Sequence, residues 1–260
     1  MSALRIAPRA VVTGASSGIG RATALALARA GLEVLAVARR EPELERLAAE
    51  APERIRPLVA DVTSADDRVR IREALRGEPL GALVHGAGVF PRGPLSGVSA
   101  DDWRAAMATN VDARLHLVQE LAPSLRGGRV LFVGSDAATT PRAGGAVYSI
   151  SKAASLMLWR CLAVELGDEI TFAMAKPGLV ATDMLEGSLA APRDAFPAGE
   201  VYEAMCARGE TVAPETVARF FRWLLLETDA AELGADGWDI RDQHHHARWL
   251  EGPLYTPRGR

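Results

Sequence analysis

Short apolar runs alternate along the chain with longer segments in which apolar residues recur every three or four positions. The short runs predict strands, and the longer segments predict helices. Strands are expected at Ala10–Thr13, Leu32–Ala38, Ile55–Ala60, Ala82–His85, Arg129–Gly134, Ile170–Ala175 and Gly237–Ile240. Helices are expected at Gly18–Ala30, Glu41–Ala49, Ala65–Arg76, Ala100–Leu125, Tyr148–Leu166 and Pro214–Glu227. This alternation is typical of an α/β protein with a doubly wound parallel sheet of about seven strands and helices on both faces.

The chain shows neither an internal repeat nor a linker rich in proline, glycine or serine. Residues 1–260 are therefore expected to form a single domain. One segment, Met184–Val212, interrupts the alternation of strands and helices and contains Pro192 and Pro197. Because long connections of this kind usually have a function, we interpret residues 184–212 as a lid over a substrate site.

The composition excludes several classes of protein. Hydrophobic residues make up 48% of the chain, charged residues 24%, and the formal net charge is −3, which is the profile of a soluble globular protein. Without an excess of positive charge, nucleic acids and membrane surfaces are poor candidate partners. The two cysteines favour a reducing compartment. Residues 1–9 contain no cleavable hydrophobic stretch, so the cytoplasm is the expected location.

The first predicted strand runs directly into a glycine-rich turn, Thr13-Gly-Ala-Ser-Ser-Gly-Ile-Gly20, and then into a helix. Glycines permit a sharp turn and a close approach of backbone to a ligand, and a helix N-terminus presents free N–H groups to a phosphate. The spacing of Gly14, Gly18 and Gly20 matches neither GxGxxG nor the P-loop. Taken alone, the turn is either a phosphate-binding loop or an ordinary strand-to-helix connection.

Tyr148 and Lys152 open a predicted helix four residues apart, which places both side chains on one helical face. A nearby ammonium favours the phenolate, so the lysine is expected to draw the pKa of the phenol from about 10 toward the working range. Only two of the 30 basic residues are lysines, so a general need for positive charge does not explain Lys152. Asn110 is likewise the only asparagine in the chain.

Together these motifs resemble the compact short-chain dehydrogenases/reductases, whose nucleotide signature is Thr-Gly-x-x-x-Gly-x-Gly. The resemblance spans nearly the whole chain. It continues through Asp61-Val62, Gly86-Ala87-Gly88, Asn110, Ser135, Tyr148-Ser-Ile-Ser-Lys152 and Lys176-Pro-Gly-Leu-Val-Ala-Thr182. The chain departs from the family where His85 and Gly86 replace two asparagines, and we interpret His85 as a structural residue beside the adenine pocket. The resemblance implies a Rossmann-type fold that binds NAD(P)(H).

The resemblance also implies roles for individual residues. Tyr148 would move the proton as general acid/base, and Lys152 would lower the pKa of that tyrosine and bind the cofactor ribose. Ser135 would polarise the substrate oxygen, and Asn110 would hold a water that links Lys152 to solvent. The expected cofactor-binding residues are Gly14, Ser16, Ser17, Gly18, Ile19, Gly20, Arg39, Arg40, Asp61, Val62, Gly86, Ala87, Gly88, Tyr148, Lys152, Pro177, Gly178, Val180 and Thr182.

The end of the second predicted strand favours NADP(H) over NAD(H). Ala38 occupies the position where the family usually has an acidic residue for the ribose hydroxyls, and Arg39 and Arg40 follow. An arginine at this point can bind a 2′-phosphate through paired charge-assisted hydrogen bonds. The alternative is that both arginines are solvated charges at the start of a helix, and Ser17 is not the basic residue that many NADP-dependent relatives have in the turn.

We therefore interpret the protein as an NADP(H)-preferring oxidoreductase that acts on a small carbonyl or secondary alcohol in a mainly apolar pocket. Candidate pocket residues are Phe90, Pro91, Ala137, Met184, Leu185, Phe196 and Tyr202. One alternative is a nucleotide-sensing or scaffold protein without turnover, against which the intact Ser135, Tyr148 and Lys152 argue. Another is a lyase or sugar-nucleotide epimerase, for which the chain is short.

Two further features bear on partners and metals. By resemblance, the predicted helix Ala100–Leu125 and the helix after it form a dimer seam, which implies a homodimer or homotetramer. His244, His245 and His246 are consecutive, so their side chains point in different directions and lack the spacing of a metal site. No metal is expected, and these histidines are predicted to lie in a surface or interface loop.

Overall fold

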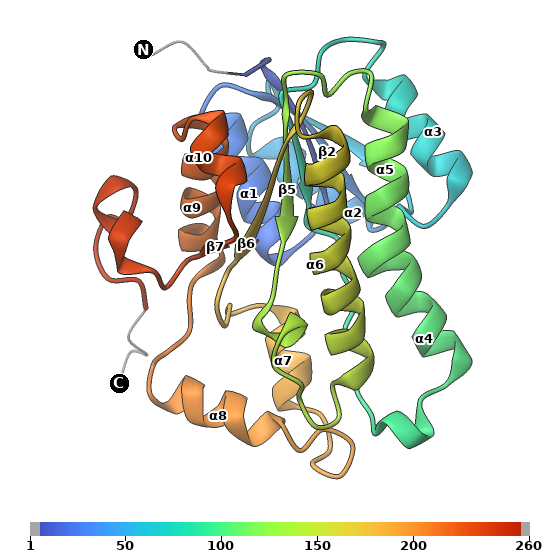
Figure 1. Ribbon diagram of the computed structural model, residues 1–260, viewed down its shortest axis with the longest axis vertical. Coiled ribbons are helices and arrows are strands. Elements are labelled where there is room, and N and C mark those ends of the chain that lie inside the picture. Colours follow the sequence, from blue (N-terminus) through green and yellow to red (C-terminus); the bar gives the residue numbers. More distant parts are fainter. Residues whose placement is uncertain (1–5, 256–260) are drawn as a thin grey trace.

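One sheet of seven parallel strands organises the structure, a computed structural model that describes residues 6–255 (Figure 1). Its strands are β1 (Arg9–Thr13), β2 (Glu33–Ala38), β3 (Ile55–Val59), β4 (Ala82–His85), β5 (Arg129–Val133), β6 (Thr171–Lys176) and β7 (Trp238–Asp239). Their order is β3-β2-β1-β4-β5-β6-β7, so the winding reverses between β1 and β4. An open α/β sheet binds ligands beyond the carboxyl ends of its strands at such a point. The expected doubly wound fold is confirmed. The expectation that residues 1–9 contain no export signal falls partly on residues 1–5, which lie outside the described residues.

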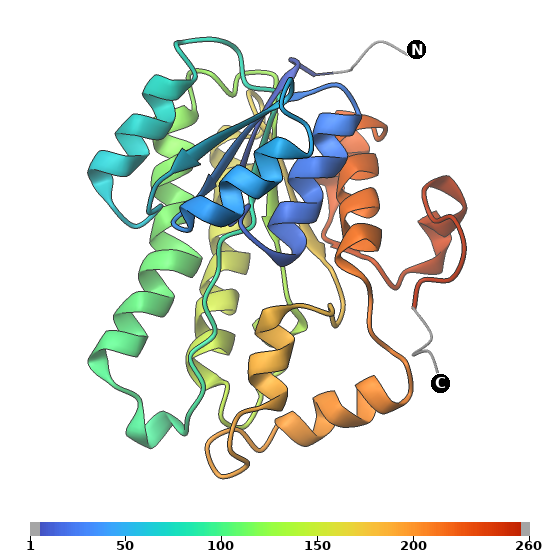
Figure 2. The same ribbon diagram turned by 180° about the vertical axis from the view of Figure 1, so that it is seen from behind.

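Helices cover both faces of the sheet (Figures 1 and 2). One face packs against α1 (Gly18–Arg29), α2 (Glu41–Ala49), α9 (Pro214–Leu226) and α10 (Ala230–Ala235). The other packs against α3 (Ala65–Ala74), α5 (Ala113–Leu121) and α6 (Ala146–Leu166). Strand β5 is buried along its whole length, as its continuous apolar run predicts for a strand covered on both faces.

The expectation of one helix over Ala100–Leu125 is wrong. Helix α4 (Ala100–Met107) is followed by one π-helical turn, Ala108–Asp112, and then by α5. The turn holds one more residue than an α-helical turn and is often found at functional sites, and here it contains Asn110. Helix α5 ends at Leu121 because Pro123 cannot continue a helix and restricts the residue before it.

The segment 184–212, for which the sequence predicts no helix, is largely helical. Helices α7 (Asp183–Leu189) and α8 (Gly199–Ala207) lie below the carboxyl ends of the strands in Figure 1. Both are too short to show a clear period. The far end of the segment is fixed by backbone hydrogen bonds, since Val212 donates to Leu179 at 2.8 Å and Ala181 donates to Val212 at 3.0 Å.

The tail beyond β7 includes the 3₁₀ helix Gln243–Arg248. His244 is exposed, but His245 is buried, accepts a 2.8 Å hydrogen bond from Trp249 Nε1 and stacks on the Phe220 ring. The expected surface loop is therefore wrong for His245, because its ring completes an aromatic core against α9.

Among residues 6–255, no helix has both the length and the apolar character to cross a bilayer. The same residues contain no group of three or more His, Cys, Asp and Glu side chains that could hold a metal ion.

Candidate active site

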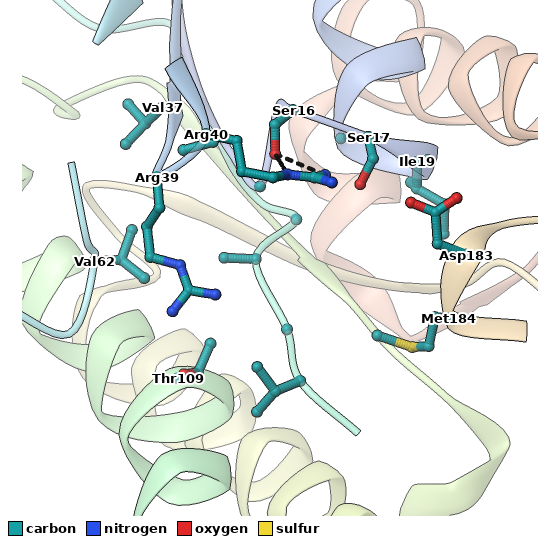
Figure 3. A pocket seen from close by; sticks show the side chains of 18 of the residues that line it. Ser16, Ser17, Ile19, Val37, Arg39, Arg40, Val62, Thr109, Asp183 and Met184 are labelled. Carbon is teal, nitrogen blue, oxygen red and sulfur yellow. Dashed lines mark hydrogen bonds between the residues drawn. The ribbon is translucent and has the colours of Figure 1, made fainter. Parts of the chain in front are cut away.

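A cleft with a cavity of about 280 Å³ lies at the reversal point, between the turn after β1 and the ends of β2 to β4 (Figure 3). Fourteen of the expected cofactor-binding residues line it: Gly14, Ser16, Ser17, Gly18, Ile19, Gly20, Arg39, Arg40, Asp61, Val62, Gly86, Ala87, Gly88 and Thr182. The sequence reasoning missed Val37, Thr109 and Asp183, which also line the cleft. Their only signal in the sequence is that they adjoin expected site residues.

Bare backbone shapes the inner wall of this cleft. Gly14 has a φ of +68°, and a Cβ added there would lie 2.7 Å from the Ala87 nitrogen. A Cβ on Gly20 would lie 2.3 Å from the Gly14 oxygen. Helix α1 begins after Ser17 without a side-chain cap, so its first N–H groups are left for a ligand. Since no side chain fits at these glycines, the turn presents backbone and a helix terminus, which suits a pyrophosphate.

The two arginines after β2 lie in different parts of the cleft. Arg40 donates from Nε and Nη2 to the Ser16 hydroxyl at 3.1 and 3.0 Å, as the dashed lines in Figure 3 show. The Arg39 side chain extends away from Ser16 toward Thr109 in the same view, and its Nη1 lies 3.7 Å from Asp61 Oδ2. Both guanidinium groups are thus at the cleft surface, and Arg40 is the one beside the glycine turn.

A second cavity, of about 190 Å³, adjoins the cleft and shares Ile19, Gly86 and Thr182 with it. Ser135 at the end of β5 and Tyr148 and Lys152 in the first turns of α6 line it. Three further expected cofactor residues, Pro177, Gly178 and Val180, lie with Thr182 on its wall after β6. The structure therefore brings together three of the four expected catalytic residues.

The expected catalytic side chains are held by local contacts. Tyr148 and Ser135 line the same cavity, and the Ser135 hydroxyl lowers the pKa of Tyr148. The Lys152 amine lies 5.4 Å from the centre of the Tyr148 ring and donates to the Val133 carbonyl at 3.0 Å. Ser135 Oγ also accepts the Ala137 N–H at 3.1 Å, which fixes the turn after β5.

The expected lowering of the Tyr148 pKa by Lys152 is wrong for the protein without a ligand. Burial raises the pKa of Tyr148 to about 12, against the lowering effects of the Ser135 hydroxyl and the Arg114 charge. Burial, and then the charge of Arg114, lower the pKa of Lys152 well below its ordinary value. The reason is desolvation, which disfavours the charged form of both groups.

Asn110 lies behind the cavity instead of lining it. The residue is 0% exposed, and its Oδ1 accepts the Val89 N–H at 3.0 Å. Its Nδ2 donates to the Val89 carbonyl and the Ser151 hydroxyl, both at 2.9 Å. Because both amide hydrogens are bound to protein, this side chain anchors the loop after β4 to α6, and the expected water-holding role of the side chain is not supported.

Aromatic rings form one wall beside Tyr148. Phe90 stacks on the Tyr148 ring with centroids 4.2 Å apart, and Phe196 meets Phe90 edge-on at 5.5 Å. Tyr202 of α8 lies 5.7 Å from Phe196. Arg92 ties this wall to α7, donating from Nη2 to the Met184 carbonyl at 2.7 Å. Of the expected pocket residues, Phe90, Ala137, Met184, Leu185 and Tyr202 line the cavity, whereas Pro91 and Phe196 do not.

A charged network that the sequence reasoning missed also borders this cavity. Lys176 Nζ lies 2.9 Å from Asp239 and 3.5 Å from Asp136. Arg241 donates to Asp239 at 2.6 Å and to Asp136 at 2.8 Å. Burial raises the pKa of Asp239, but the hydrogen bonds from Arg241 and Lys176 outweigh this effect and hold the pKa well below its ordinary value. The network joins the ends of β5, β6 and β7; its sequence signal is Lys176, one of only two lysines.

His85 takes a buried position at the end of β4 and does not line the nucleotide cleft. Its ring is tilted against Phe132 with centroids 4.7 Å apart, and its Nε2 has no hydrogen-bond partner. Burial, followed by the charge of Arg114, lowers the pKa of His85 well below its ordinary value. The interpretation of His85 as a structural residue agrees with this position, but its contacts are with the sheet interior.

Comparison with known proteins identifies the family. The profile of the short chain dehydrogenase family matches residues 8–192. The chain is 35% identical over 184 residues to the L-xylulose reductase of Caenorhabditis elegans, which covers 68% of this chain and 73% of that protein. The crystal structure of the KRED1-Pglu enzyme is similar with a TM-score of 0.83 at 29% identity, covering 89% of this chain and 100% of that one.

A short chain dehydrogenase from Burkholderia cenocepacia, solved in complex with NADP, is similar with a TM-score of 0.77 at 29% identity. The similarity covers 90% of this chain and 97% of that one. The chain belongs to the short-chain dehydrogenase/reductase family and is an NAD(P)-dependent oxidoreductase.

Proposed function

We propose that this enzyme prefers NADP(H) and transfers a hydride between nicotinamide and a small carbonyl or secondary alcohol, with Tyr148 as general acid/base. The observation that carries the proposal is that Ser135, Tyr148 and Lys152 line one cavity where it meets the cleft, with the Lys152 amine 5.4 Å from the centre of the tyrosine ring. A substrate oxygen placed there would reach both hydroxyl groups.

The residues present fit a dinucleotide. The glycine backbone and the uncapped start of α1 suit the pyrophosphate, and Asp61 and Val62 border the cleft where the adenosine would lie. Val180 and Thr182, at the shared edge of the second cavity, would hold the carboxamide of the nicotinamide ring. When bound, the nicotinamide accepts the hydride from an alcohol carbon or gives it to a carbonyl carbon.

The side chains of the protein handle the proton that accompanies this hydride. In alcohol oxidation, the deprotonated Tyr148 oxygen takes the hydroxyl proton; in carbonyl reduction, the Tyr148 hydroxyl gives its proton to the oxygen that gains charge. Ser135 donates a hydrogen bond to that oxygen and orients it. Lys152 would bind the ribose. Its amine, which donates a hydrogen bond to the Val133 carbonyl, lies close enough to Tyr148 to reach a cofactor bound beside that residue.

Three features support a preference for NADP(H). The last residue of β2, Ala38, brings no carboxylate that would repel a 2′-phosphate. The Arg40 guanidinium donates a hydrogen bond to the Ser16 hydroxyl. The Arg39 side chain is 70% exposed, and its contact with Asp61 is 3.7 Å long. Both side chains are therefore free to reorient toward a bound 2′-phosphate. The similar dehydrogenase from Burkholderia cenocepacia was solved with NADP.

We also propose that residues 1–260 act as a single domain in which 184–212 forms the substrate lid. Helices α7 and α8 lie over the cavity that holds Tyr148, and they contribute Met184, Leu185, Ser188, Tyr202 and Met205 to its lining. The wall near Tyr148 is mainly apolar, which favours a substrate with an apolar body and one reacting oxygen.

A homodimer or homotetramer in the cytoplasm completes the proposal. Ile150, Met157 and Val164 recur every seven residues on the exposed side of α6, and Trp103 is exposed on α4. Exposed apolar side chains along one side of two helices favour association with a second copy. Cys161 and Cys206 are both free, which agrees with a reducing compartment.

The decisive experiment is a screen of NADPH consumption against aldehydes, ketones and quinones, run with wild type and Tyr148→Phe. We expect the phenylalanine variant to bind NADPH normally and to lose on the order of 10²–10⁴ in turnover, because it lacks the proton donor. Turnover equal to wild type in this variant would remove Tyr148 from the mechanism. Tight NADPH binding without turnover of any carbonyl would favour a nucleotide sensor.

A further inference from the structure

Arg114, in the first turn of α5, is a buried cation that the reaction described above does not use. It is 2% exposed and lines the cavity that contains Tyr148 and Lys152. Its Nη1 donates to the Ser155 hydroxyl at 2.8 Å, and both terminal nitrogens lie 3.4 Å from the Val133 carbonyl. No carboxylate of residues 6–255 contributes to the pKa shift of Arg114. The Nε of Arg114 has no hydrogen-bond partner.

A position of this kind normally holds an apolar residue. Arg114 shares the buried face of α5 with Leu117, Val118 and Leu121. Burying a guanidinium without a carboxylate is unfavourable relative to leaving it in water, and a leucine or methionine would fill the same space without that cost. The position therefore calls for a role that depends on charge.

The surroundings of Arg114 place that charge beside the catalytic residues. The Val133 carbonyl that faces Arg114 also accepts the 3.0 Å hydrogen bond of the Lys152 amine, so two cationic groups share one acceptor. Arg114 and Tyr148 influence each other's pKa values, and the Arg114 charge also influences the pKa of Lys152. Tyr202 influences the pKa of Tyr148 as well, and Arg114 influences that of His85. All the groups in this set are neutral or cationic, unless a tyrosine loses its proton.

Burial affects the two cations in the same direction. It lowers the pKa of Arg114 to about 10, so the guanidinium stays charged at neutral pH. Burial and the Arg114 charge lower the pKa of Lys152. The Tyr148 phenol in the same cavity can supply a negative charge, and the Arg114 charge lowers its pKa against the effect of burial.

We propose that Arg114 is a positioning residue for catalysis: its buried positive charge, in the wall of the cavity that holds Tyr148, adds to that of Lys152 in stabilising the deprotonated form of Tyr148. The inference rests on the proposed role of Tyr148 in proton transfer. It gives a residue of α5 a part in the electrostatic task that the family resemblance assigns to the lysine of α6.

The test compares Arg114→Met and Arg114→Gln with wild type by the pH dependence of kcat/KM for alcohol oxidation with NADP⁺. Methionine removes the charge and the hydrogen bonds, whereas glutamine removes the charge and retains a donor for Ser155. We expect both variants to raise the apparent pKa of the group that must be deprotonated by about one unit. At pH 7 this corresponds to a loss of about tenfold in kcat/KM. Ser155→Ala is the matched control, because it removes a hydrogen bond to Arg114 but leaves the charge.

A second readout does not depend on turnover. The chain has only three tyrosines, Tyr148, Tyr202 and Tyr255, so phenolate absorbance with NADP⁺ bound, compared with Tyr148→Phe, isolates the titration of Tyr148. We expect this titration to shift upward in both Arg114 variants. An unchanged profile in Arg114→Gln would overturn the proposal, even if Arg114→Met were less stable or failed to fold. Full activity of Tyr148→Phe would instead overturn the proposed function itself.

Discussion

The nucleotide cleft and the cavity around Tyr148 adjoin each other but are built from different parts of the chain. Backbone shapes the cleft, and its glycine turn, strand ends and first helix come mostly from residues 13–89. Side chains shape the catalytic cavity, and they come from α5, α6, the segment 184–212 and the tail after β7. The family profile ends at residue 192, so α8 and the tail lie outside the matched region. We therefore expect the backbone conformation to recognise the cofactor that the family shares, and replaceable side chains to recognise the substrate.

Among the substitutions that test this comparison between cleft and cavity, one added methyl group in the cleft should have the largest effect, a loss of NADPH affinity. In Gly14→Ala, the new Cβ would meet the Ala87 nitrogen at 2.7 Å with φ at +68°. Crowding of this kind costs about 1–3 kcal/mol, so we expect NADPH affinity to fall by roughly 10- to 100-fold, measured by fluorescence titration. Gly77→Ala is the control, because Gly77 has a φ of +72° but no atom within 4 Å. If both variants bound NADPH equally well, backbone shape would not govern the cleft.

A smaller effect, on the preference for NADPH over NADH, is expected at Arg39 and Arg40. Here side chains, and not backbone, form the wall of the cleft. Arg39→Asp and Arg40→Asp each place a carboxylate where a 2′-phosphate would bind. Hydrogen bonds to charged groups contribute about 1.5–3 kcal/mol, so the ratio of kcat/KM for NADPH over NADH should fall at least about tenfold in one of them. The contact of Arg40 with Ser16 predicts the larger change for Arg40→Asp. Glu41→Ala, at the neighbouring start of α2, controls for a general change in charge.

The smallest effect is expected in the catalytic cavity, at the ring stacked on Tyr148. Phe90→Ala removes an aromatic contact with a centroid distance of 4.2 Å. Such pairs contribute about 0.5–1.5 kcal/mol, so KM for an apolar ketone should rise about two- to tenfold. The dissociation constant of NADPH should not change. Leu95→Ala, an exposed position in the same loop, should leave both constants unchanged. Equal changes in KM and NADPH affinity after Phe90→Ala would contradict the division between the two regions.

The same division explains what could be predicted from the sequence. The sheet, and the residues of the glycine turn, follow from apolar periodicity and from a motif in which each glycine has a geometric reason. The π turn at Asn110 was not predicted, because one extra residue in a helical turn leaves the apolar pattern of α4 and α5 nearly intact. Helices α7 and α8, at 7 and 9 residues, were missed because two prolines and short lengths hide their period.

Electrostatics was the least predictable property of the site. The spacing of Tyr148 and Lys152 gives their proximity but not their burial, and burial determines the direction of both pKa shifts. Arg114 carries no sequence signal, since arginine is the usual basic residue of this chain. Its role follows only from the contacts it makes once α5 packs on β5 and α6.

Both lysines of the chain, Lys152 and Lys176, line the catalytic cavity. Arginine provides all the other permanently charged basic side chains, and guanidinium groups do not react with ordinary acylating reagents. Immobilising the enzyme on a support through lysine amines would therefore attach it at Lys176, whose side chain is 38% exposed, and obstruct substrate entry. Coupling through carboxylates, which are spread over the surface, would leave the cavity open.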